Sequence, residues 1–304
     1  MTEDRRIVAV VVTHDRRELV QRLVKALSDL RGLEEVLVVD NASDDGTGEW
    51  LAGLGQSGVL GRTLAENTGG AGGFHEGLRW AVERGADLVW LMDDDGFPEP
   101  ECLDTLVRYA GDLDLWGPVV VDEADPDRLV FPIRPPGGTR VLHDMGDVRR
   151  AADAGLIRGI VIPFNGVLVT RDLVQRIGLP RAEFFIWGDD HEYRLRAQRA
   201  GARVATVVDA RVHHPSVGAL GTPMAFGRTT YNDTPSDLKH YCMARNNLVN
   251  LREYGGPLHA LAFVAKTLWF YSFTRRDPDR IRLSIGAWRD ALRGNFTGHR
   301  RFLE

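Results

Sequence analysis

A short apolar run that ends in three consecutive acids constrains the fold of this chain more than any other feature. Residues 88–92 are apolar, and Asp93, Asp94 and Asp95 follow them directly. Such a run predicts a buried parallel strand, so the acids would lie at its carboxyl edge, where open α/β sheets bind ligands. Adjacent carboxylates repel one another, and folding tolerates them where a cation neutralises them or water solvates them. The triplet is thus either a site for Mg²⁺ or Mn²⁺ carrying a phosphate or a solvated acidic turn.

Strands and helices alternate through the first part of the chain. Apolar runs predict strands over residues 7–12 and 36–39 and, weakly, over residues 59–63. Between the first two, Asp15 and Glu18 form a capping box, which predicts that a helix starts at Asp15. This alternation is typical of an α/β protein with a mostly parallel, Rossmann-like sheet flanked by helices.

The C-terminal part differs from the rest in both pattern and charge. Residues 216–236 are rich in Gly, Thr and Pro and predict a loop, whereas residues 237–304 predict helices. Residues 257–304 hold nine Lys and Arg against four Asp and Glu, although the whole chain has a net charge of −5. We therefore predict a boundary after residue 236 and a basic, helical C-terminal region.

Composition excludes several classes of protein. The net charge of −5 gives no case for nucleic-acid binding. Cys102 and Cys242 lie outside any CxxC or ligand-spaced pattern, so both are expected to be free thiols in a reducing compartment. No signal peptide opens the chain, and no stretch reaches the roughly 18 apolar residues that a membrane span needs. These features predict a cytoplasmic protein without a membrane-spanning helix.

Two further segments carry groups suited to a nucleotide. Asp40 follows the strand at residues 36–39, where its carboxylate can accept hydrogen bonds from a base or a ribose hydroxyl, or can cap a helix. Residues 67–73 are rich in glycine but lack the P-loop ending and the GxGxxG spacing. They predict either close backbone approach to a ligand, with the helix at residues 74–84 facing a phosphate, or a flexible loop.

A second acidic cluster occurs later in the chain. Asp189 and Asp190 stand at the start of a helix predicted over residues 190–200. An acid in that place can serve as a general base, and it can also cap the helix. Trp187 beside them is either a platform for a sugar ring or a core aromatic.

A pair of histidines also follows a predicted strand. His213 and His214 come after the strand predicted over residues 204–208. Histidine is a common ligand for ions such as Mn²⁺, and a lone histidine is also frequently structural. Both interpretations stay open for this pair.

Six segments, in this order and spacing, resemble the family-2 glycosyltransferases with a GT-A fold. They are VVVTHDR (10–16), VVDNASDDGT (38–47), ENTGGAGGF (66–74), LMDDDG (91–96), GDDHEYRLR (188–196) and HHP (213–215). The resemblance covers most of residues 7–215. It implies a metal-dependent, inverting transfer of a sugar from a nucleoside diphosphate to an acceptor hydroxyl.

Within that family, the chain is most similar to the initiating bacterial galactofuranosyltransferases of cell-wall galactan synthesis. The segments that carry this similarity are NTGGAGGF (67–74), the triplet DDD (93–95), FPIR (131–134), FNG (164–166), RNN (245–247) and RRDP (275–278). The similarity implies UDP-galactofuranose as the donor and a polyprenyl-diphosphate-linked glycan as the acceptor. Rhamnosyltransferases share the core motifs. A nucleotidyltransferase and a non-catalytic module that binds sugar nucleotides are further alternatives.

The resemblance also implies roles for individual residues. The nucleotide sugar would contact Thr13, Asp40, Asn67, Gly69, Gly70, Asp93 and Asp94, with Asp40 at the uracil. The metal, Mn²⁺ or Mg²⁺, would bind Asp93, Asp95 and His214, with His213 as a rival. Asp190 would be the general base, and the acceptor would contact Trp187, Asp189 and His191.

Domain organisation and partners follow from the same resemblance. Residues 1–236 would be the GT-A catalytic domain, with a nucleotide-sugar half at about 1–116 and an acceptor half at about 117–236. In the C-terminal region, one predicted helical face is apolar: Leu258, Leu261, Ala262, Ala265, Leu268 and Trp269. An apolar face followed by arginines suits an anionic membrane, here the inner face of the plasma membrane. Packing on the catalytic domain or on a second copy in a homo-oligomer is the alternative.

Overall fold

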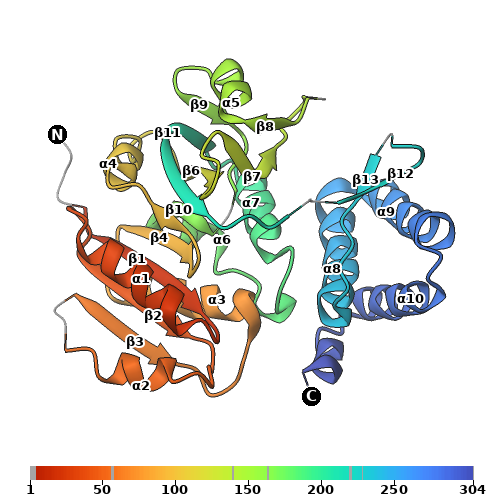
Figure 1. Cartoon of the computed structure of the whole chain (residues 1–304), viewed down its shortest axis with the longest axis horizontal. Helices are drawn as coiled ribbons and strands as arrows, with labels where there is room; N and C mark the ends of the chain where they lie inside the picture. Colours follow the sequence, from red (N-terminus) through yellow and green to blue (C-terminus); the bar gives the residue numbers. More distant parts are fainter. Residues whose placement is uncertain are drawn as a thin grey trace. The chain divides into compact units, whose positions relative to one another are not determined.

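Four apolar segments near the start of the chain form the parallel part of a sheet (Figure 1). The computed structural model of the chain describes residues 5–55, 58–138, 140–162, 164–218, 221–227 and 229–303. The four strands are β1 (Ile7–Thr13), β2 (Glu35–Asp40), β3 (Val59–Thr63) and β4 (Leu88–Asp93). They lie in the order β3-β2-β1-β4, and every residue of β1 is buried because both faces of this strand are covered.

Strands of both directions complete the sheet beyond β4. They are β5 (Phe97–Pro98), β6 (Leu115–Asp122), β7 (Arg128–Ile133), β8 (Leu142–Asp144), β9 (Leu156–Arg158), β10 (Asn165–Thr170) and β11 (Val204–His214). β10 runs antiparallel to both β4 and β6, whereas β11 runs parallel to β6. The predicted class, a mostly parallel α/β sheet flanked by helices, is confirmed.

Helices cover both faces of this sheet (Figure 1). They are α1 (Arg17–Ser28), α2 (Thr47–Ala52), α3 (Gly69–Glu83), α4 (Cys102–Val107), α5 (Met145–Ala151), α6 (Arg171–Ile177) and α7 (Asp189–Arg199). Side chains of β1 alternate between two cores, as the two-residue period of a strand requires. Ala9 and Val11 share one core with Leu23 of α1, whereas Val10 shares the other with Leu78 of α3.

The first helix is capped from a distant segment. α1 begins at Arg17, and Asp15 has a left-handed backbone (φ 51°), so the predicted capping box with Glu18 is wrong. Instead, the Asp45 carboxylate, in the segment after β2, accepts a hydrogen bond from the Arg17 N–H at 2.8 Å. A cap supplied by another segment has no local sequence signal.

The glycine-rich segment is mostly helix. α3 begins at Gly69, within the stretch predicted as a loop before a helix at residues 74–84. A Cβ atom on Gly73 would lie 2.4 Å from Val12 Cγ1, and one on Gly77 would lie 2.3 Å from Val10 Cγ1. These glycines therefore let the helix pack closely on β1.

β11 extends further than its sequence pattern predicts. The strand was expected over residues 204–208 but runs to His214, and its register against β6 shifts between Val207 and Arg211. A bulge of this kind keeps a strand paired while interrupting its regular pattern. His213 and His214 therefore lie on the strand itself.

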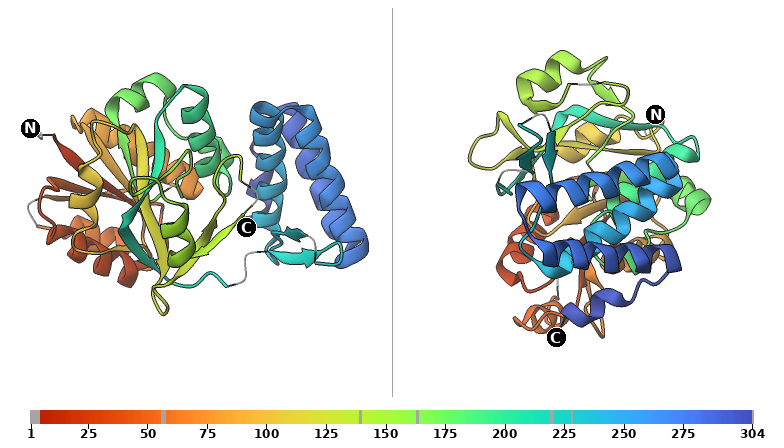
Figure 2. Two further views of the ribbon diagram at one scale, coloured as in Figure 1. Left: turned by 90° about the horizontal axis from the view of Figure 1, so that it is seen from above. Right: turned by 90° about the vertical axis from the view of Figure 1, so that its right-hand side faces the viewer.

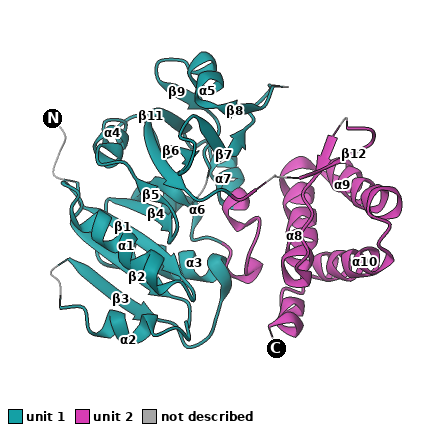
Figure 3. Ribbon diagram, viewed as in Figure 1, with its two compact units in different colours: residues 1–180, 193–216 teal, residues 181–192, 217–304 magenta. Residues whose placement is uncertain are grey.

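The chain divides into two compact units, coloured separately in Figure 3. The first, which we call unit 1, comprises Met1–Pro180 and Tyr193–Ser216, and unit 2 comprises Arg181–Glu192 and Val217–Glu304. Residues 1–4, the start of the predicted catalytic domain, and residue 304, the end of the predicted C-terminal region, lie outside the described residues. Unit 2 thus includes Arg181–Glu192 in addition to the predicted helical region, and the predicted domain boundary after residue 236 stays a prediction.

Unit 2 is predominantly helical, which confirms the predicted helical C-terminal region (Figure 2). Its elements are the 3-10 helix η1 (Ala182–Phe184), the hairpin β12 (Thr222–Met224) and β13 (Thr229–Tyr231), α8 (Asp237–Asn250), the π-helix η2 (Leu251–Gly255), α9 (Pro257–Trp269), the π-helix η3 (Phe270–Thr274), α10 (Pro278–Arg293) and the 3-10 helix η4 (Gly298–Phe302). α8 packs against both α9 and α10. Throughout the described ranges, no helix combines the length and the apolar character that crossing a bilayer requires.

Candidate active site

Three strands of unit 1 end side by side. In the register of the sheet, Thr13 of β1 pairs with Asp40 of β2, and Val12 of β1 pairs with Asp93 of β4. Parallel strands bring their carboxyl ends to one edge, so residues far apart in sequence meet there. This edge carries Thr13, Asp40 and the Asp triplet, as the sequence predicted.

Arg16 neutralises part of the triplet. Its Nη1 donates to Asp94 Oδ1 at 2.9 Å and to Asp95 Oδ2 at 2.7 Å. Thr13 Oγ1 donates to Asp94 Oδ2 at 2.7 Å, so both oxygens of this buried carboxylate are bonded. The triplet is therefore not the solvated turn that the sequence left open. Arg16 lies in the segment VVVTHDR but was not among the predicted site residues.

The two carboxyls respond differently to this setting. Burial raises the pKa of Asp94, although Thr13 and Arg16 oppose the shift. Burial also acts to raise the pKa of Asp95, but the hydrogen bond and charge of His214, together with Arg16, outweigh it, and the pKa is lowered. Asp95 is therefore the more firmly ionised of the two, as a metal ligand must be.

The two histidines of β11 face different carboxylates. His214 Nε2 lies 3.0 Å from Asp95 Oδ1, whereas His213 Nε2 lies 3.1 Å from Glu99 Oε1. His214 Nδ1 donates to the Pro215 carbonyl at 2.7 Å, and the Phe131 ring meets the imidazole edge-on with centroids 5.3 Å apart. Phe131 and the carbonyl thus fix the orientation in which Nε2 faces Asp95.

Asp95 and His214 fit a divalent ion. Two neighbouring ligand atoms, each about 2.1 Å from an octahedral ion, are about 3.0 Å apart. The distance between Asp95 Oδ1 and His214 Nε2 is 3.0 Å. One carboxylate and one imidazole suit Mn²⁺ better than Mg²⁺. Within the described part of the chain, no three His, Cys, Asp or Glu side chains gather into a ligand cluster, so a diphosphate and water would supply the remaining ligands.

The end of β2 offers an acceptor to a ligand. Asp40 is fully buried, and its Oδ1 accepts from the Ser43 N–H at 3.0 Å. Its Oδ2 is buried with no hydrogen-bond partner in the described ranges, which is costly unless a bound donor satisfies it. The neighbouring Asn41 donates to the Gly69 carbonyl at 2.8 Å and accepts from the Thr68 N–H at 2.8 Å. Asn41, which sequence reasoning passed over, thus joins β2 to the start of α3.

The N-terminus of α3 is held at the same edge. Asn67 Oδ1 accepts from the Gly69 N–H at 2.8 Å, and Asn67 Nδ2 donates to His14 Nε2 at 3.0 Å. A Cβ atom on Gly70 would meet nothing within 4 Å. A helix N-terminus with an open approach favours an anion, because its N–H groups point outward.

Unit 2 carries the second predicted group. Trp187 is 37% exposed, so the core-aromatic alternative is wrong, and its left-handed backbone (φ 71°) costs about 1–3 kcal/mol. Asp189 is buried at the start of α7, Asp190 is half-buried and His191 is exposed. Burial, and then the charge of Asp190, raise the pKa of Asp189 to about 8. Asp189 is therefore a weaker acid than an ordinary aspartic acid.

Comparison with known proteins identifies the family. A sequence profile for glycosyl transferase family 2 matches residues 8–153. The galactofuranosyltransferase GlfT1 of Mycobacterium tuberculosis is 35% identical over 291 residues, which cover 91% of this chain and 92% of the relative. The protein of the same name from Mycolicibacterium smegmatis is 33% identical over 294 residues, which cover 93% and 95%. The chain belongs to glycosyltransferase family 2.

A solved structure of similar fold agrees with this assignment. GalNAc-T7, whose crystal structure contains UDP, GalNAc and Mn²⁺, matches 93% of this transferase with a TM-score of 0.58 at 14% sequence identity, over 55% of its own length. At this identity the likeness concerns the fold alone. The predicted GT-A fold is thereby confirmed.

The structure of the transferase therefore groups most of the predicted residues in two sets. At the strand edge of unit 1 lie Thr13, Asp40, Asn67, Gly69, Gly70, Asp93, Asp94, Asp95 and His214. In unit 2 lie Trp187, Asp189, Asp190 and His191. That Asp190 converges with Asp95 and His214 in one crevice stays a prediction, as do the individual roles.

Proposed function

We propose that the chain transfers galactofuranose from UDP-galactofuranose to a hydroxyl of a polyprenyl-diphosphate-linked glycan in cell-wall polysaccharide assembly. The observation that carries this proposal is the similarity to the two mycobacterial galactofuranosyltransferases, which extends over 91–93% of the chain. The family profile ends at residue 153. The similarity to these relatives extends beyond it and includes unit 2, because it covers 91–93% of the chain. A similarity confined to the nucleotide-binding strands would support only sugar-nucleotide binding.

In this proposal the strand edge of unit 1 binds the donor. Asp95 and His214 would hold Mn²⁺ or Mg²⁺ together with the diphosphate and water, and Asp93, the first acid of the triplet, would border the metal site. The ion supplies positive charge that stabilises the departing diphosphate. Asp40 Oδ2, a buried acceptor without a partner in the described ranges, suits an N–H of the uracil. Thr13, Asp94 and the start of α3, with Asn67, Gly69 and Gly70, would border the nucleotide and its phosphates.

Asp190 would act as the general base. It would take the proton of the acceptor hydroxyl while that oxygen bonds to the anomeric carbon, on the face opposite the diphosphate. The bond from the anomeric carbon to the diphosphate oxygen breaks, its electron pair leaves with UDP, and the configuration inverts. Asp189 is buried whereas Asp190 is half-buried, so Asp190 is the more accessible of the two as a base. Trp187, Asp189 and His191 would contact the acceptor.

The best test is a donor screen. UDP-galactofuranose, UDP-galactopyranose, UDP-glucose, UDP-GlcNAc and dTDP-rhamnose are each offered with Mn²⁺ and a polyprenyl-diphosphate-linked disaccharide, and release of nucleoside diphosphate is measured. We expect release from UDP-galactofuranose to exceed the others at least about 100-fold, because buried polar groups that match one sugar reject another strongly. Preferred use of dTDP-rhamnose would identify a rhamnosyltransferase instead. No release from any donor would support a binding module.

A lipid-linked acceptor places the enzyme at a membrane surface, and unit 2 offers an apolar face for it. Leu258 is 78% exposed, Leu261 and Phe273 are each 64% exposed and Trp269 is 46% exposed. Leu268, predicted on this face, is half-buried and packs against the core of the unit instead. Exposed Arg275 and Arg276 follow. The Arg275 guanidinium pairs with Asp233 at 2.7 Å, so Arg276 supplies the positive charge beside the apolar area.

We therefore propose peripheral attachment to the cytoplasmic face of the membrane. Sedimentation with vesicles of phosphatidylglycerol is expected to exceed that with phosphatidylcholine. Leu261→Asp should reduce it about tenfold, because a buried leucine contributes about 1.5–3 kcal/mol. Sedimentation that is the same with both lipids would argue against the model. Solution scattering would report whether this face instead joins two copies in a homo-oligomer.

A further inference from the structure

The segment just before the proposed base has an unusual backbone. Phe185 (φ 66°), Trp187 (φ 71°) and Gly188 (φ 87°) are all left-handed, and two of them carry aromatic side chains. Large residues rarely adopt this conformation, and they keep it only where the surrounding structure fixes it. Contacts with other groups of unit 2 must therefore hold residues 184–188 in this conformation.

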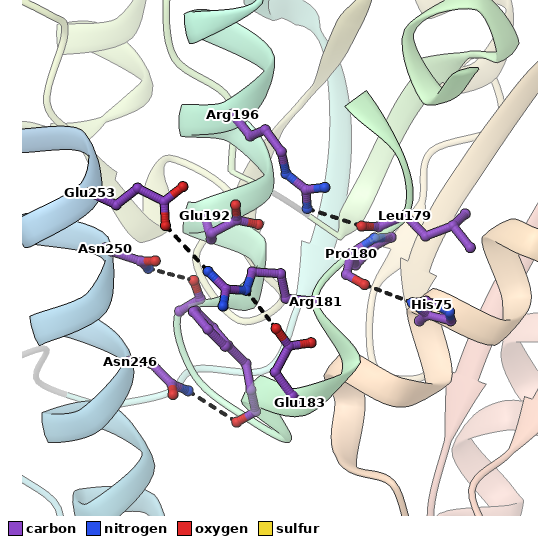
Figure 4. Close-up of polar contacts among 12 residues, drawn as sticks. His75, Leu179, Pro180, Arg181, Glu183, Glu192, Arg196, Asn246, Asn250 and Glu253 are labelled. Atoms are coloured by element: carbon purple, nitrogen blue, oxygen red, sulfur yellow. Dashed lines mark hydrogen bonds and ion pairs between the residues drawn. The ribbon is translucent and has the colours of Figure 1, made fainter. Parts of the chain in front are cut away.

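Two asparagines of α8 supply the donors. Asn246 Nδ2 lies within hydrogen-bonding distance of the carbonyl oxygens of Phe184 (3.0 Å), Ile186 (3.1 Å) and Trp187 (2.8 Å). An amide nitrogen has two hydrogens, so at least one of them is shared between two of these three oxygens. Asn250 Nδ2 donates to the Gly188 carbonyl at 2.8 Å (Figure 4). The two side chains thus bind four of the five carbonyl groups in the segment.

Further groups extend this contact to both sides. The fully buried Arg245 donates from Nη2 to the Phe184 carbonyl at 2.9 Å. The Tyr254 hydroxyl of η2 donates to Glu192 Oε1 at 2.5 Å, two residues after Asp190. Residues 246, 250 and 254 recur at the four-residue spacing that places side chains on one face of a helix. One face of α8 and η2 therefore follows the segment along its length.

These contacts differ from ordinary helix packing. Asn246 and Asn250 are 0% and 1% exposed, and burying an amide is costly unless it is hydrogen-bonded. Apolar side chains would pack the helix without that cost but would not select one backbone conformation. Buried donors aimed at successive carbonyls fix the course of the backbone, and so the position of the residues that follow it.

We propose that Asn246 and Asn250 are positioning residues, which hold residues 184–188 so that Asp190 and Trp187 meet the acceptor. This inference rests on the proposed function, in which Asp190 is the general base. It gives the C-terminal region a role in the chemistry besides the proposed attachment to a membrane. Both asparagines are buried, so in this proposal they act through the segment that they bind.

The test compares full-length variants in the transfer assay. Asn246→Ala removes the donor to three carbonyls, and Asn250→Ala removes the donor to one. Asn247→Ala is the matched control, since Asn247 lies between them on α8 but donates no hydrogen bond to the segment. We expect kcat to fall about 100-fold and about 10-fold for the first two, because misplacement by about 1 Å costs about 100-fold. UDP affinity in the presence of Mn²⁺ and the KM for donor should stay within about twofold.

The outcomes separate this inference from the function on which it rests. Wild-type kcat in both variants would overturn it, and so would a loss of UDP affinity that matches the loss of kcat, because that result indicates general structural damage. If Asn246→Ala does not fold, Asn250→Ala decides the question alone. Asp190→Asn is measured in parallel. An active Asp190→Asn enzyme would overturn the base assignment itself, whereas an inactive one beside active asparagine variants would overturn only the positioning role.

Discussion

The strand edge of unit 1 and residues 184–190 of unit 2, which we call the base segment, both carry carboxylates, but they are held in opposite ways. At the strand edge, the guanidinium of Arg16 binds Asp94 and Asp95, and the imidazole of His214 lies against Asp95. In the base segment, the neutral amides of Asn246 and Asn250 bind backbone carbonyls. One region holds side chains by charge, and the other holds the backbone by neutral hydrogen bonds.

This difference suits two different tasks. Arg16 is half-exposed and reaches Asp95 through a flexible side chain, so it can exchange that carboxylate with an incoming cation. The amides of unit 2 are buried and cannot exchange their carbonyls with water. Under the proposed function, the region that admits a metal and a nucleotide is thus held by contacts that can be exchanged, whereas the region that orients the base is held by buried contacts that cannot.

The largest expected effect separates the two regions directly. Asp190→Asn should lower transfer about 10³- to 10⁴-fold, because the acceptor proton loses its base, while UDP affinity stays within about twofold. Initial rates and calorimetry with UDP and Mn²⁺ measure the two quantities. Asp209→Asn, which removes an exposed carboxylate of β11, is the control. Equal losses of turnover and UDP affinity in Asp190→Asn would contradict the division of roles.

Removing the metal should affect the strand edge alone. EDTA is expected to stop transfer and Mn²⁺ to restore it. Asp95→Asn should weaken Mn²⁺-dependent UDP binding about 100-fold, because the metal ion, whose positive charge faces the diphosphate, loses one of its ligands. Calorimetry at several Mn²⁺ concentrations gives the affinities. Full activity in the chelator would remove the metal from the mechanism.

The two histidines provide a sharper test of the same edge. His214→Gln should weaken Mn²⁺-dependent UDP binding about 10- to 100-fold, because Nε2 of His214 faces Asp95. His213→Gln should change it less than about threefold, since His213 contacts Glu99. Mn²⁺ titration of UDP binding compares the variants. A larger effect at His213 would reverse the assignment.

The smallest expected effect concerns the stability of the base segment. The pKa of Asp189 is raised to about 8 in the folded protein, from an ordinary value near 4. A raised pKa contributes stability that is complete below the unfolded value and is lost as pH rises toward 8. Asp189→Asn cannot ionise, so its melting temperature relative to wild type should rise between pH 5 and pH 9. A difference that does not change with pH would show that Asp189 is already ionised in the folded protein.

Local pattern predicted the elements better than their ends. The strand over residues 59–63 was predicted with the bounds that the structure has. The start of α1 was predicted two residues early because its cap comes from Asp45, in the segment after β2. The start of α3 was predicted five residues late, because glycine signals a loop in sequence but permits close packing on β1 here.

The candidate site was predicted where chemistry is local. The acids at strand ends could be found because an acid that follows a short apolar run lies at the carboxyl edge of a parallel sheet. Arg16 and Phe131 were missed because each acts through a partner distant in sequence. The amides of α8 were missed for the same reason, since nothing near residues 245–250 indicates that their partners lie at residues 184–188.

The sequence by itself determined the alternation of strands and helices, the acids at the strand ends and the family, because period, length and residue type are properties of short segments. Only the tertiary structure decided which histidine faces Asp95, which cation neutralises the triplet and which helix fixes the base segment. Those choices depend on register and on packing between distant segments, and a shift of one residue along β11 would exchange His213 and His214 between the two faces.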